Sequence, residues 1–319
     1  LELSSAASDV YKRQPVEGAE IRFAESGRIE LLVGTESNGQ GHETTYIDLV
    51  SERLGVEADL FDYIQANTFE VRLGSGHGGA RSMHMGAATM ILAVEEVIGK
   101  AKGVAAVLLQ AEIDELSFKN GSFTSGSGNR SVTLKEVAIA ARDTRIAPHL
   151  EGMGLDTFTK RENAPFTFPN GCHAAEVEID PETGSVTLIK YIMVDDYGSL
   201  VNPVLTEGQL HGGVAQGIGQ ALMEFVSFDE NTGQLLSGSL MDYTLPRAAM
   251  LPNFEATLEG APTKANVLGV KGVGQAGCIA APQTIVHAVL NALSPLKIIH
   301  LDMPLTSQSI WRAISASRA

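Results

Sequence analysis

From residue 20 onward, apolar positions either alternate with polar ones or recur at helical spacing, which predicts strands followed by helices. RIELLVGT (28–35) and FEVRLGS (69–75) alternate as short strands do. HETTYIDLVSERLG (42–55) and MHMGAATMILAVEEVIGKAKG (83–103) have helical spacing, and each ends in glycine. This order predicts a first lobe in which strands and helices follow one another.

Weaker patterns follow within the same lobe. GVAAVLLQ (103–110) is predicted as a strand, and the glycine-rich KNGSFTSGSGN (119–129) as a loop. Ser131 is predicted to cap a helix within SVTLKEVAIAAR (131–142).

A second lobe is predicted after RENAPFTFPNG (161–171), because two prolines interrupt regular structure there. We place the lobes at residues 15–168 and 169–319. Alternating runs on both sides of a Pro-Glu-Thr-Gly turn (181–184) predict a β-hairpin. Two helices are predicted beyond it, at 205–225 and at about 281–293. The predicted class is α+β with two lobes.

The first residues, LELSSAASDVYKRQ (1–14), differ in character from the rest and resemble a translated sequencing adapter. We exclude them from fold reasoning. On this interpretation the natural protein begins further upstream and the chain is its C-terminal part. The alternative is a genuine, disordered N-terminal tail.

Composition narrows the class of protein. The chain has 319 residues, is 44% hydrophobic and 19% charged, and can bury a large core. A net charge of -15 disfavours nucleic acid and anionic membranes as partners. The two cysteines, Cys172 and Cys278, form neither a disulfide framework nor a zinc-type pair, and they fit a reducing, cytoplasmic setting. We expect no membrane span, because no apolar run approaches roughly 20 residues.

Two glycine-rich segments precede predicted helices and are candidate anion sites. In GTESNGQGHETTY, Gly39 and Gly41 flank Gln40 before a helix, where exposed backbone amides attract anions. The alternative is an ordinary turn in which Glu43 or Thr44 caps the helix.

GSGHGGARSMHMG repeats the arrangement with Arg81 and Ser82 at a helix start, and the guanidinium of Arg81 suits phosphate oxygens. His77 and His84 are interpreted as surface or core histidines, because no third metal ligand of matching spacing accompanies them.

The predicted helix LTEGQLHGGVAQGIGQALMEF contains five glycines, which together cost roughly 4 to 5 kcal/mol relative to alanine. Either close backbone packing or a ligand along the helix must offset this cost. Gln209 and Gln216 lie seven residues apart on one face and add amide groups there.

The loop VKGVGQAGC (270–278) places three glycines around a single amide, Gln275. Gly272, Gly274 and Gly277 match the dinucleotide pattern G-x-G-x-x-G. The acidic residue expected about 20 positions later is missing, and so is the βαβ unit. A nicotinamide site is therefore disfavoured.

Together these segments resemble a known family. GQGHETT, GGARS, EGQLHGGVAQGIGQAL, MDYTLPRA and GVKGVGQAG are similar, in this order, to motifs of the molybdenum-binding subunit of the xanthine dehydrogenase and aldehyde oxidase family, which includes carbon monoxide dehydrogenase large subunits. The resemblance runs from about residue 20 to the end of the chain. It implies the two-lobed α+β molybdopterin-binding region of a molybdenum hydroxylase.

The resemblance implies a molybdopterin cofactor, in bacterial members often a cytosine dinucleotide, with no metal ligands from the protein. Carried over residue by residue, it assigns cofactor binding to Gly39, Gln40, Gly41, His42, Thr44, Gly79, Arg81, Ser82, Gln209, Gly272, Val273 and Gly274.

The family hydroxylates an aldehyde, carbon monoxide or an N-heterocycle with water as the oxygen source, and a glutamate acts as general base where this chain has Gln275. An amide cannot accept that proton at neutral pH. Three interpretations stay open: a single-base change or sequencing error, a divergent enzyme that finds its base elsewhere (Glu43 or Glu207), or a non-catalytic, cofactor-binding paralogue.

The family's N-terminal half, with several substrate-selecting residues, has no counterpart here, so the substrate stays open. The chain has no cysteines for iron-sulfur clusters and no flavin motif. The resemblance therefore implies iron-sulfur and FAD-binding partner subunits or missing domains, assembled as a dimer of heterotrimers or a similar complex.

Overall fold

The computed structural model describes residues 16–126 and 130–318. The adapter-like segment 1–14 lies outside the described residues. The described chain forms two compact units. Among the described residues, the first unit contains 16–167 together with Pro262–Gly272, and the second contains Phe168–Ala261 and 273–318.

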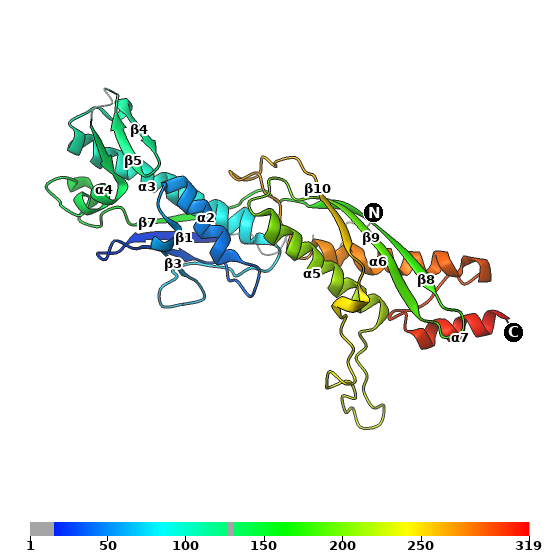
Figure 1. Cartoon of the computed structure of the whole chain (residues 1–319). Helices are drawn as coiled ribbons and strands as arrows, with labels where there is room; N and C mark the ends of the chain where they lie inside the picture. Colours follow the sequence, from blue (N-terminus) through cyan, green and yellow to red (C-terminus); the bar gives the residue numbers. More distant parts are fainter. Residues whose placement is uncertain (1–15, 127–129, 319) are drawn as a thin grey trace. The chain divides into compact units, whose positions relative to one another are not determined.

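The first unit is organised by a four-stranded sheet with strand order β3-β2-β1-β7 (Figure 1). Helix α3 packs on β1 and β7, and α2 packs on α3, so apolar side chains of sheet and helices share one core. The bounds are β1 (Val16–Phe23), β2 (Ile29–Val33), α2 (His42–Leu54), β3 (Phe61–Ile64), α3 (Ala88–Leu109) and β7 (Thr157–Glu162).

The structure confirms the strand predicted within 28–35 and the helix predicted at 42–55. The strand predicted at 69–75 is wrong, because that segment is irregular and the side chain of Phe69 is 99% exposed. The strand predicted at 103–110 is also wrong, since α3 continues to Leu109. Burial of Val104 and Ala105 against the core outweighs the helix-weakening effect of Gly103.

A small antiparallel sheet of order β4-β5-β6 and the helix α4 complete this unit. Their bounds are β4 (Leu116–Lys119), β5 (Ser122–Ser125), β6 (Ser131–Thr133) and α4 (Leu134–Ala140). The loop predicted at 119–129 therefore contains a strand. The predicted cap at Ser131 is also wrong: Thr133 caps α4, in a reciprocal capping box with Glu136.

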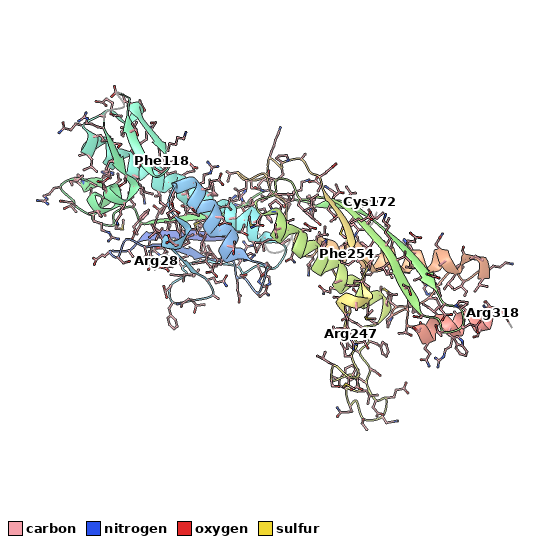
Figure 2. The ribbon with its side chains drawn as sticks, in the orientation of Figure 1. Arg28, Phe118, Cys172, Arg247, Phe254 and Arg318 are labelled. Carbon is pink, nitrogen blue, oxygen red and sulfur yellow. The ribbon has the colours of Figure 1, made fainter. Side chains whose placement is uncertain are left out.

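The second unit opens with the predicted hairpin, which the antiparallel pairing of β8 (Asn170–Ile179) with β9 (Val186–Asp196) confirms. β10 (Phe254–Leu258) pairs parallel to β9, and Phe254 is labelled on it in Figure 2. Helix α6 packs on both β8 and α5. The helices are α5 (Pro203–Leu222), α6 (Ala276–Leu293) and α7 (Ser307–Arg318).

Four of the five glycines of α5 fall into two pairs. A Cβ at Gly217 would lie 2.6 Å from Cβ of Ala281, and one at Gly213 would lie 3.0 Å from the amide nitrogen of Cys278. By contrast, a Cβ at Gly208 or Gly212 would meet nothing within 4 Å. Close packing against α6 therefore accounts for the first pair, whereas the second pair leaves an open strip on the helix.

The segment between α5 and β10 forms an arm with little regular structure, drawn in yellow-green to yellow in Figure 1. Apolar side chains on it are exposed, and Met241 is 92% exposed. A turn with Gly233 at φ 71 lies between Phe228 and Leu235, which form an isolated β-bridge.

One helical stretch in the described chain, Ala276–Leu296, is long and apolar enough by length and composition to cross a bilayer, with a mean hydropathy of 1.3. This corrects the expectation that no apolar run approaches that length. Because α6 packs against α5 and β8, part of this stretch lies in the core of the second unit.

The remaining short helices are η1 (Ala58–Leu60), η2 (Ser82–Ala87), η3 (Ile113–Glu115), η4 (Pro148–Leu150), η5 (Ala248–Met250) and η6 (Ser294–Leu296).

Candidate functional site

The first candidate anion loop ends at the N-terminus of α2. Gly39 and Gly41 have φ of 116° and 73°, conformations that favour glycine. No side chain caps α2, so the proposed cap by Glu43 or Thr44 is wrong. Oε1 of Gln40 accepts from the backbone amide of Asn38 at 2.6 Å and holds the loop closed on itself. The first-turn amides of α2 therefore remain for another acceptor.

The second candidate loop, residues 74–82, also has a left-handed backbone, at Gly76 (φ 71), Gly79 (φ 86) and Ala80 (φ 54). A non-glycine residue such as Ala80 is strained there by about 1 to 2 kcal/mol. The left-handed Ala80 is followed by the right-handed Arg81 (φ -84), and such a pair turns successive amides toward one side, as in an anion-binding nest.

Arg81 follows this loop, and its side chain points into the protein. It is fully buried, and Nη1 lies 2.7 Å from Oε2 of the equally buried Glu17. Burial raises the pKa of Glu17 to about 7, and the charge of Arg81 opposes that rise. From the sequence we expected the guanidinium of Arg81 to point at a phosphate. In the structure it is instead paired with Glu17 inside the first unit.

Tyr46 ties the two loops together. Its hydroxyl donates to the backbone oxygen of Ser82 at 2.5 Å and lies 2.9 Å from Oγ1 of Thr35. Ser82 begins the π-helical turn η2, and a hydroxyl inserted at a backbone carbonyl explains a widened turn there. Gly86 is required in that turn, because a Cβ would collide with the Tyr46 hydroxyl.

Three predicted glycine segments therefore meet within the first unit. The amide of Gly76 donates to the carbonyl of Gly34 at 3.3 Å, and Nδ2 of Asn38 lies 3.4 Å from Nε2 of His77. A Cβ at Gly272 would lie 2.6 Å from Cβ of Ala80. The sequence placed these segments apart along the chain, and the fold brings them together.

Histidines add polar atoms at the same place. Nδ1 of His42 and Nδ1 of His77 are buried and find no hydrogen-bond partner among the described residues. Burial and, to a lesser degree, the nearby His77 together lower the pKa of His42 to about 4. Neutral His42 therefore offers an unused ring nitrogen beside the first loop.

His84 is predicted to make stability depend on pH. Burial lowers its pKa to about 4, with Arg161 and Arg81 contributing, whereas in the unfolded chain it titrates near 6.5. Below pH 6.5 the unfolded state binds the extra proton, so stability falls as pH falls toward 4. Between pH 6.5 and 5 this titration lowers the free energy of unfolding by about 2 kcal/mol, at about 1.4 kcal/mol per pH unit. We expect His84→Gln to abolish that decrease.

The check is urea unfolding followed by circular dichroism at pH 7 and pH 5. The exposed His149 in the same unit gives a matched control, and His149→Gln should leave the pH dependence as it is. An unchanged dependence in His84→Gln would contradict the assignment.

The second unit holds the rest of the predicted site. Gln275 is the N-cap of α6, is exposed, and makes no side-chain cap to that helix. Nε2 of Gln209, from α5, donates to the carbonyl oxygen of Gly274 at 2.7 Å. Gln209 thus fixes the backbone directly before Gln275. Val273 packs against the core of this unit.

The predicted residues thus divide between the units at the peptide bond after Gly272. The first unit holds Gly39, Gln40, Gly41, His42, Thr44, Gly79, Arg81, Ser82 and Gly272, and the second holds Gln209, Val273, Gly274 and Gln275. Sequence reasoning missed Glu17 and Tyr46. Tyr46 lies four residues after His42, a helical spacing that could have signalled it, whereas an acid in an apolar strand gave no signal for Glu17.

Several known proteins and one family profile are similar to this chain. Residues 3–252 match the profile of the molybdopterin cofactor-binding domain. The carbon monoxide dehydrogenase large chain of Hydrogenophaga pseudoflava is 31% identical over 93% of this chain and 37% of its own length. The nicotine 6-hydroxylase large subunit of Paenarthrobacter nicotinovorans is 33% identical over 96% of this chain and 37% of its own.

A crystal structure of the Cu,Mo-CO dehydrogenase in its carbon monoxide reduced state superposes with a TM-score of 0.86 at 30% identity, over 95% of this chain and 38% of that chain. The chain therefore spans a little over a third of the length of the curated relatives it matches.

Proposed function

The chain belongs to the molybdopterin cofactor-binding domain family, and from this premise we propose that it forms the cofactor-binding portion of a molybdenum hydroxylase large subunit. The observation that carries the proposal is the meeting of two left-handed glycine loops at an uncapped helix start in the first unit. Such a place offers backbone amides to a ligand with several negative charges.

The residues present fit that group. Helices α4 and α5 carry side-chain caps from Thr133 and Asn202, whereas α2 and α6, which begin at the candidate loops, carry none. A Cβ at Gly39 or Gly76 would meet nothing within 4 Å, which leaves space beside the amides. The unpartnered Nδ1 atoms of His42 and His77 add two polar positions.

In the proposed arrangement, amides of 39–44 and 76–82 bind the pterin and its phosphates, and Gly272 allows the close approach of Ala80. Gln209 orients the loop that carries Gln275. When bound, molybdopterin supplies a molybdenum centre that accepts electrons from the substrate, with water as the oxygen source. We propose the cytosine dinucleotide form of the cofactor, whose phosphates the same amides would bind.

The substrate class proposed is carbon monoxide, an aldehyde or an N-heterocycle, since the relatives act on carbon monoxide and nicotine according to their names. Partners that carry iron-sulfur clusters and FAD would pass the electrons onward, in a cytoplasmic complex such as a dimer of heterotrimers. The name "large chain" of one relative accords with a multi-subunit assembly.

A second candidate function is cofactor binding without turnover, and Gln275 favours it. The amide can hold a substrate by hydrogen bonds but cannot take up a proton at neutral pH. In this reading the loops bind the group as above, and only the proton-removing step fails.

The proposal is tested by metal and nucleotide analysis of the full-length protein recovered from its source DNA. We expect molybdenum and, after acid release, a cytidine phosphate. Release of NAD, or a protein without molybdenum after expression in a host that supplies the cofactor, would contradict it.

A matched pair of glycines sharpens this test. Gly76 and Gly233 both have φ of 71°, and a Cβ at either would meet nothing within 4 Å, so alanine strains both alike. Only Gly76 lies in a candidate loop. Gly76→Ala should lower molybdenum content about tenfold, the effect of losing about 1.4 kcal/mol of contacts, while Gly233→Ala retains it. Equal content in the two variants would count against the loop as a binding site.

A further inference from the structure

The buried pair formed by Glu17 and Arg81 lies behind the loop 74–82. Both side chains are 0% exposed, and the pair joins the start of β1 to the residue that closes the loop. Nη2 of Arg81 also donates to the carbonyl oxygen of Val16 at 2.7 Å. The guanidinium is therefore fastened to β1 by both a carboxylate and a carbonyl.

The same pair holds the loop at both ends. Nη1 of Arg81 reaches the carbonyl oxygen of Gly76 at 3.4 Å, and the backbone amide of Ser75 hydrogen-bonds to Glu17. Gly34 lies against the pair and the loop. A Cβ at this position would collide with Oε1 of Glu17 and with Gly74, so only glycine fits there. Between these fixed points lie Gly79 and the strained Ala80.

Such a pair is a poor source of stability. Desolvation of two buried charges offsets much of their attraction, and apolar replacements of similar size are often neutral or stabilising. Nε of Arg81 is buried without a hydrogen-bond partner among the described residues, which adds to the cost. Strained backbone persists only where its surroundings over-determine it, and it concentrates at ligand sites.

We propose that Glu17 and Arg81 are positioning residues that hold loop 74–82 in its ligand-ready shape, and that Arg81 serves binding through the loop's amides and not by contacting phosphate. This inference rests on the proposed function for the identity of the ligand. The shape of the loop, however, can be tested with or without a cofactor.

Glu17→Gln separates the two roles of Arg81, because it keeps the size of the side chain and removes its charge. If Arg81 contacted phosphate, freeing it from Glu17 would leave molybdenum content equal or higher. If the pair positions the loop, Arg81 becomes an unpaired buried charge, the loop loosens, and molybdenum content of the full-length protein falls about tenfold or more. Retained content would overturn the proposal.

A double variant, Glu17→Leu with Arg81→Met, guards against a variant that fails to fold. It removes both charges and fills the space with apolar side chains. We expect it to fold but to retain as little molybdenum as Glu17→Gln, because leucine and methionine cannot make the hydrogen bonds to Ser75 and Gly76. Recovery of the molybdenum content would show that these bonds do not position the loop, and the proposal would fail.

Hydrogen exchange separates this proposal from the function it rests on. In cofactor-free full-length protein, the amides of 76–80 should exchange at least about tenfold faster in Glu17→Gln than in the unchanged protein, while those in the middle of α2 stay equal. If the unchanged protein binds no molybdenum but this acceleration occurs, the proposed function fails and the positioning role stands. Equal exchange at 76–80 would overturn the positioning role.

Discussion

Gln275→Glu is expected to raise the turnover of the full-length complex by about 100- to 10,000-fold, the usual contribution of a positioned general base. Gln275 stands at the N-cap of α6, where the helix N-terminus favours a negative charge. A glutamate placed there would be ionised at neutral pH and so able to take up a proton. The helix dipole also stabilises this negative charge, so we expect the substitution to raise the free energy of unfolding by at most about 0.3 to 1 kcal/mol.

The measurement is substrate-dependent dye reduction with carbon monoxide, aldehyde and purine substrates, at equal molybdenum content. Gln216→Glu is the matched control, because it adds the same charge at an exposed position of α5 in the same unit. If the glutamine form is already active and glutamate at 275 adds nothing, the proton leaves by another route. In that case the second candidate function is wrong as well.

Gly217→Val is expected to destabilise the second unit by about 3 kcal/mol, at the upper end of the usual cost of overpacking. A Cβ at this position already lies 2.6 Å from Cβ of Ala281 and 2.9 Å from Cδ of Pro282, so valine would force α5 and α6 apart. Pro282 lies within α6 and cannot swing aside as a long, flexible side chain could.

Gly212→Ala in the same helix is the matched control and should act in the opposite direction. No atom lies within 4 Å of a Cβ there, so alanine gains its helix propensity of about 0.8 to 1 kcal/mol without a clash. The single tryptophan of the chain, Trp311 in α7, reports unfolding of this unit by fluorescence in urea. A similar loss in both variants would show that helix packing is not the reason for Gly217.

Gly212 also bears on the alternative that a ligand lies along the helix. If Gly212→Ala keeps its stability but lowers molybdenum content, the open strip formed by Gly208 and Gly212 belongs to the cofactor site. If the molybdenum content is unchanged, close packing of α5 against α6 alone explains why the helix is rich in glycine.

Strong local signals allowed correct predictions. The hairpin β8–β9 was predicted from the alternating residues of each strand, and α2 from its helical spacing up to Gly55. Both patterns depend only on residues close together in the sequence. The errors came where tertiary contacts outweighed local preference, as in 103–110, whose apolar run reads equally well as a strand and as a buried helix.

The motifs of the site were visible in the sequence because backbone chemistry fixes them. Left-handed conformations at Gly39, Gly41, Gly76 and Gly79 favour glycine, and the amide of Gln275 is recognisable from residue type alone. The sequence by itself therefore determined the family, the class and the glycine loops that we propose as the cofactor site.

Only the tertiary structure decided what the polar side chains of the site face. Arg81 reads as a phosphate partner in the sequence, yet it is buried against Glu17, 64 residues earlier in the chain. Gln209 fixes the carbonyl of Gly274, and Tyr46 holds the carbonyl of Ser82. Such partners lie far apart along the chain, and their pairing depends on how sheet and helices pack, which no local pattern of residues encodes.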